Sequence, residues 1–67
     1  MKVVKVIMTG SKNVWTIEND DGSKVFKTYY PGYETFTLWP TKKDAKLILE
    51  AIKSHSLEYV KGKIYNE

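Results

Sequence analysis

Short apolar stretches follow one another along most of the chain, and turn-forming residues separate them. β-Branched and aromatic side chains dominate these stretches, which is typical of strands on a pleated surface. The pattern predicts five strands, over residues 2–8, 14–18, 23–30, 35–39 and 57–65. The connection between the second and third strands contains Asp21 and Gly22, a pair that tolerates the positive φ angles of a tight hairpin.

One segment has the period of a helix instead. Its apolar side chains recur at positions i, i+3, i+4 and i+7, and they are Ala45, Ile48, Leu49 and Ile52. Such spacing places them in one stripe. Thr41 suits the N-cap, and Asp44 lies in the first turn, where a negative charge is favourable. The spacing predicts an amphipathic helix that begins after Thr41 and ends near the segment Ser54-His55-Ser56.

These elements follow the order β-β-β-β-α-β. A helix with a single apolar stripe covers one face of one sheet. We therefore expect an α+β fold, with an antiparallel sheet of three to five strands and the helix packed on one face. Sixty-seven residues make a single small domain, residues 1–67. A chain of this size has no room for a large enclosed substrate cavity.

The composition excludes several classes of protein. The chain has no cysteine, so disulfides and cysteine-ligated metals are excluded. No apolar run is long enough to cross a bilayer, and lysines interrupt the apolar residues of the first segment, which is unlike a secretory signal. We expect a cytoplasmic protein without a membrane partner.

Catalytic motifs are missing. The single histidine, His55, lies between two serines just after the helix, and adjacency in sequence does not align a nucleophile with a base. The glycines are isolated, which excludes a phosphate-binding loop, and Asp20 and Asp21 supply too few oxygens for a calcium loop. We therefore expect no enzyme, no cofactor and no metal.

The basic residues indicate one class of partner. All eleven are lysines, against eight acids, which gives a net charge of +3. Lysine is a mobile point charge and lacks the rigid fork with which arginine reads guanine. A nucleic-acid-binding surface is the alternative hypothesis, and its candidate residues are Lys12, Lys24, Lys27, Lys42 and Lys43.

The nine aromatic residues exceed what so small a core requires. Trp15, Phe26 and Phe36 are assigned to the core, whereas most of the others gather around the bend at residues 31–32. Tyrosine and tryptophan offer large, stiff and amphipathic contact area, which favours them at interfaces. The predicted binding surface consists of Lys27, Tyr29, Tyr30, Tyr33, Thr37 and Trp39.

Three short runs support a resemblance, namely VWTI at 14–17, DG at 21–22 and WPTKKDA at 39–45. Together they resemble the N-terminal arm-binding domain of phage-type tyrosine integrases. That resemblance implies a three-stranded sheet on one helix, which binds duplex DNA through the sheet face away from the helix. Over its whole length the chain is similar to small basic ββ(β)αβ proteins of phages and mobile elements. This second resemblance implies a protein that acts by binding.

Our leading hypothesis is a non-enzymatic binding module, a phage-type inhibitor that binds a host or defence protein through the aromatic-rich sheet and bend. The first alternative is a duplex DNA-binding protein that uses the exposed sheet face. The second is a protein that sequesters nucleotides, with aromatic rings stacking on the base and lysines holding phosphate. An unpaired sheet edge would also permit a homodimer.

Overall fold

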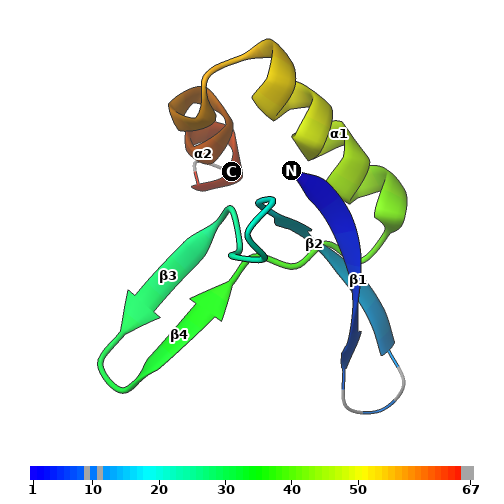
Figure 1. Cartoon of the computed structure of the whole chain (residues 1–67), viewed down its shortest axis with the longest axis vertical. Coiled ribbons are helices and arrows are strands. Elements are labelled where there is room, and N and C mark those ends of the chain that lie inside the picture. The colour runs from blue at the N-terminus through cyan, green and yellow to red at the C-terminus, as the bar shows by residue number, and fades with distance from the viewer. Residues whose placement is uncertain (9, 11, 66–67) are drawn as a thin grey trace.

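The computed structural model describes residues 1–8, 10 and 12–65 (Figure 1). Within them the chain forms four strands, which are β1 (Lys2–Met8), β2 (Lys12–Glu18), β3 (Lys27–Tyr30) and β4 (Tyr33–Phe36). Two helices follow, α1 (Lys42–Ser54) and α2 (Leu57–Tyr65). The predicted α+β class is confirmed. Neither helix is long and apolar enough to cross a membrane.

The strands form two small antiparallel sheets, whereas we expected one sheet of three to five strands. β1 pairs with β2 from Lys2 opposite Glu18 to Met8 opposite Lys12. β3 pairs with β4, and Tyr30 opposite Tyr33 closes that hairpin. The two ribbons point away from each other, with the helices at the opposite end of the molecule (Figure 1).

Short backbone contacts join the two ribbons where they meet. Trp15 and Trp39 exchange hydrogen bonds of 2.9 and 2.8 Å, and the amide of Val25 donates to the carbonyl of Ile17 at 2.9 Å. The second edge of β2 is therefore paired for only a few residues. Beyond Phe26 and Thr37 the chain leaves β2: the side chain of Phe26 lies in the core, and the hairpin continues outward.

The core lies between the β1–β2 ribbon and the two helices. Ile17, Phe26, Leu49 and Val60 form its buried centre, and each comes from a different segment of the chain. The predicted helix is confirmed as α1, whose apolar stripe faces this centre. Its predicted cap is confirmed as well, because the hydroxyl of Thr41 accepts a hydrogen bond from the amide of Asp44 at 3.1 Å.

The predicted last strand over 57–65 is wrong, because these residues form α2 and the element order is β-β-β-β-α-α. The hydroxyl of Ser56 accepts a hydrogen bond from the amide of Tyr59 at 3.2 Å and so begins the helix. Leu57, Val60 and Ile64 recur at helical spacing. Val60 fills the core and Ile64 packs beside it, so one face of a helix is buried.

The predicted tight turn at 19–22 is confirmed. The carbonyl of Asn19 accepts a hydrogen bond from the amide of Gly22 at 3.0 Å, and Gly22 has a φ of 87°. The Asp21 carboxylate accepts hydrogen bonds from the hydroxyl of Ser23 at 2.6 Å and from its amide at 2.9 Å. These two bonds lower the pKa of Asp21 from its ordinary value of 3.8.

This turn makes the stability of the fold dependent on pH. The pKa of Asp21 is lower in the folded chain, so the turn stabilises the fold at neutral pH and loses that contribution as the pH falls below about 4. We expect the thermal midpoint to decrease on acidification, and to decrease less in the variant Asp21→Asn. Ser23→Ala removes only one donor and should have a smaller effect. Equal acid sensitivity of the wild type and Asp21→Asn would contradict this prediction.

Candidate binding surface

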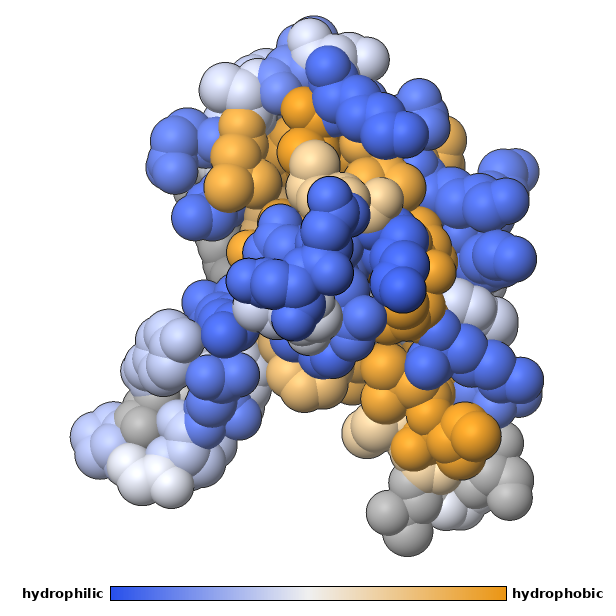
Figure 2. Space-filling view, in the orientation of Figure 1, coloured by the Kyte–Doolittle hydropathy of each residue, from blue (hydrophilic) through white to orange (hydrophobic). Residues whose placement is uncertain are grey.

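The β3–β4 hairpin projects from the body of the molecule (Figure 1). Pro31 and Gly32 connect its two strands. The proline ring fixes φ near −65° and Gly32 has a φ of 91°, which together are typical of a type II turn. Figure 2 shows that the projecting end of this hairpin is polar to neutral, whereas apolar surface extends along the β1–β2 ribbon.

The register divides the hairpin residues between two faces, since residues directly opposite each other share a face. Lys27, Tyr29, Glu34 and Phe36 lie on one face, and Thr28, Tyr33 and Thr35 lie on the other. Tyr29 is 69% exposed and Tyr33 is 61% exposed. The hairpin therefore presents one well-exposed tyrosine on each side. Tyr30 pairs with Tyr33 in the backbone register, and its side chain lies outside the described part of the chain.

The charges of the hairpin balance each other. Lys27 and Glu34 are the charged residues of the segment 27–36. Their side chains lie on one face, and the ammonium of Lys27 is 3.8 Å from the carboxylate of Glu34. The hairpin therefore carries no net charge, and Lys27 is already positioned beside an acid.

Thr37 and Trp39 lie apart from the hairpin surface, although the sequence grouped them with it. The carbonyl of Thr37 accepts a hydrogen bond from the buried hydroxyl of Thr16 at 2.8 Å. Trp39 is half-buried and its ring meets that of Phe26 edge-on, with centroids 5.9 Å apart. Both line a separate surface depression of 440 Å³, between α1, α2 and the segment before α1.

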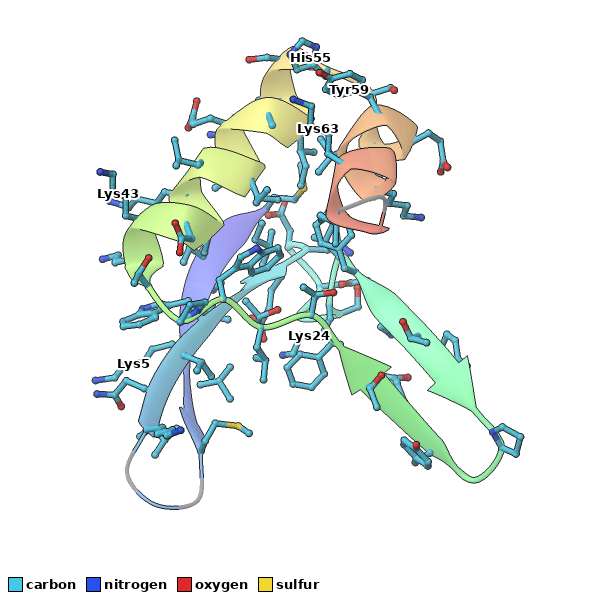
Figure 3. All side chains as sticks on the ribbon, turned by 180° about the vertical axis from the view of Figure 1, so that it is seen from behind. Lys5, Lys24, Lys43, His55, Tyr59 and Lys63 are labelled. Atoms are coloured by element: carbon cyan, nitrogen blue, oxygen red, sulfur yellow. The ribbon has the colours of Figure 1, made fainter. Side chains whose placement is uncertain are left out.

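The five lysines of the nucleic-acid hypothesis occupy separate places. Lys24 pairs with Glu18, and its ammonium lies 5.3 Å from the centroid of the Phe36 ring. Lys12 begins β2, whereas Lys42 and Lys43 are exposed at the start of α1. Figure 3 shows Lys24 and Lys43 on different parts of the molecule. These side chains and Lys27 do not form one continuous basic stripe.

A row of side chains along the α1–α2 corner was missed from the sequence. The ring of His55 lies 4.6 Å from that of Tyr59, and the ammonium of Lys63 lies 5.4 Å from the Tyr59 ring (Figure 3). Their spacing of four residues would have shown the row if 57–65 had been interpreted as a helix. Across the part of the chain that the structure describes, no three histidine, aspartate or glutamate side chains are grouped to hold a metal ion.

Comparisons with models of protein families, with curated proteins and with solved structures gave no match to this chain.

Proposed function

We propose that this protein is a non-enzymatic binding module that holds a protein partner with its β3–β4 hairpin. The observation that carries the proposal is the presence of two well-exposed tyrosines, Tyr29 and Tyr33, on opposite faces of one projecting hairpin. A hairpin with an aromatic ring on each face suits insertion into a groove whose two walls it contacts at once. Tyrosine contributes a large contact area at a low cost in conformational entropy.

A protein partner fits this hairpin better than duplex DNA. Phosphate contacts need cations that are free to replace counterions along one face. Lys27 lies beside Glu34, Lys24 pairs with Glu18, and the hairpin has no net charge. The same balance disfavours a nucleotide ligand, whose phosphates would need a cation beside the stacked base.

Inhibition is the specific role that we propose for this hairpin. A hairpin that fills a groove excludes the other ligands of that groove, and this is how a phage-type inhibitor of a host or defence protein would act in the cytoplasm. The fold supports such a role, because the core lies at the other end of the molecule and the hairpin can be buried in a partner without disturbing it.

The first test is loss of binding when both tyrosines are replaced. A partner captured from host lysate is purified, and its affinity is measured for the wild type and for the double variant Tyr29→Ser/Tyr33→Ser. Interface tyrosines at the centre of a contact each contribute about 2 kcal/mol, so we expect the double variant to bind about 1,000-fold more weakly. Far-UV circular dichroism should show an unchanged fold, because both side chains are exposed.

The matched control is Tyr59→Ser, which removes an exposed tyrosine from α2 and should keep wild-type affinity. Equal affinity of the wild type and the double variant would show that the hairpin is not the contact surface. If the captured partner is instead nucleic acid, with an affinity that falls steeply as salt is added, the DNA-binding alternative replaces this proposal.

A further inference from the structure

In the part of the chain that the structure describes, the outer edge of β1 has no strand beside it. Among the described residues, β1 pairs with β2 alone, whereas the second edge of β2 is contacted by Trp39 and Lys24. Such an edge presents unpaired backbone N–H and C=O groups that can accept another strand. Proteins usually protect an edge with charges, prolines or bulges. β1 has seven residues, and its only such protection is Lys2 and Lys5.

The second half of β1 is also unusually apolar for an exposed strand. Ile7 is 75% exposed and Met8 is 42% exposed, and they lie on opposite faces of the ribbon. Val4 and Val6 share the face of Met8 and are half-buried. The apolar surface along this ribbon in Figure 2 distinguishes it from the polar β3–β4 hairpin. Apolar side chains therefore flank the unpaired backbone on both faces.

We propose that a second copy of the chain pairs with this edge, with the two β1 strands antiparallel about a two-fold axis at Val6. The symmetric register places Val6 opposite Val6, Val4 opposite Met8, and Lys5 opposite Ile7. Two of these three kinds of pair are wholly apolar, and in the third the aliphatic stem of Lys5 lies along Ile7 while its ammonium stays in water. The strand is self-complementary in this register, as a two-fold interface requires.

Two other symmetric registers are less favourable. A two-fold axis at Lys5 would place two lysines directly opposite each other, which is destabilising. An axis at Val4 would leave Ile7 and Met8 near the ends of the pairing. It would also bring together the halves of β1 where Val3 packs against the helix-covered core, so that the two α1 helices approach each other. The axis at Val6 covers the exposed apolar residues and keeps those helices apart.

The interface is separate from the β3–β4 hairpin, which stays exposed in such a dimer, so the two proposals can fail independently. Each chain carries a charge of +3, and screening of this repulsion should strengthen the dimer as salt is added. Binding to nucleic-acid phosphates would instead weaken as salt is added.

Sedimentation equilibrium of the purified chain tests the proposal. We expect a concentration-dependent mass that approaches twice that of one chain. Ile7→Lys places like charges opposite each other at both symmetric positions and should weaken the dimer about tenfold or more. Adding Lys5→Glu to Ile7→Lys places opposite charges at these positions and should restore the dimer. Leu47→Lys, an equivalent change on the exposed side of α1, is the matched control and should leave the mass unchanged.

Hydrogen exchange provides a second measurement that needs no variant. The outward amides of β1 should become more protected as the wild-type concentration rises through the dimer dissociation constant. A monomeric wild type at every concentration overturns the proposal, as does a dimer that Ile7→Lys leaves intact. Failure of the double variant to restore the dimer, with folding verified by circular dichroism, overturns the register at Val6.

Discussion

Replacing Phe26 by alanine should remove a large part of the stability of the folded chain. Phe26 is 2% exposed and joins β2, α1 and α2 through the buried centre that it forms with Ile17, Leu49 and Val60. Its ring also supports the half-buried Trp39. Removal of a buried phenylalanine side chain costs roughly 3–5 kcal/mol. A domain of this length has a total stability of roughly 3–10 kcal/mol, so the loss takes a large part of it.

Urea denaturation followed by far-UV circular dichroism and tryptophan fluorescence measures the effect. Phe36→Ala is the matched control, because Phe36 is a half-buried phenylalanine on the hairpin, and it should cost clearly less. Phe26→Leu keeps most of the volume and should recover a cooperative transition. A loss for Phe26→Ala within the roughly 0.5 kcal/mol that is typical of surface substitutions would contradict this description of the core.

Elements whose signals are local were predictable from the sequence. The strand over 2–8 has the predicted bounds, and α1 has the predicted cap and buried stripe. The turn at 19–22 also forms as expected. In each case the deciding contacts, such as the bond from the amide of Asp44 to the hydroxyl of Thr41, join residues that are close in the chain.

The pairing of the strands depended on contacts that no local pattern contains. Strands predicted at 23–30 and 35–39 become a hairpin over 27–36, because Phe26 turns into the core and ends the pairing with β2. Tyr29 and Tyr33 are close in sequence, but the two-residue loop at Pro31–Gly32 sets a register that places them on opposite faces of the hairpin. The position of Trp39 beside Phe26 follows from packing across the domain.

The segment 57–65 is ambiguous in the sequence for a physical reason. Its valine, isoleucine and tyrosines favour a strand by propensity, but propensity is a weak preference that tertiary contacts override. Val60 fits the space between the β1–β2 ribbon and α1, and Ile64 follows it one helical turn later on the same side. The local signals for a helix start are Ser56, whose hydroxyl caps the first turn, and the acidic Glu58 within that turn.

Val60→Asp tests this helix and should be the second most damaging substitution. Val60 is 1% exposed, so the new carboxylate would enter an apolar core without a partner. We expect a loss of several kcal/mol and release of α2 from the ribbon and α1. The loss should shrink in mild acid, because burial raises the pKa of such a carboxyl group and protonation removes its charge.

The neighbouring substitution Tyr59→Asp is the control for Val60→Asp, because it adds the same charge on the exposed side of α2. It removes only the ring contacts with His55 and Lys63 and should cost no more than about 1 kcal/mol. Urea midpoints and the helical circular dichroism signal at neutral pH and in mild acid compare the two variants. Equal losses would mean that residue 60 does not face the core. A selective loss at Val60 supports α2 as the element that closes the core, because a domain with so few buried side chains depends on each of them.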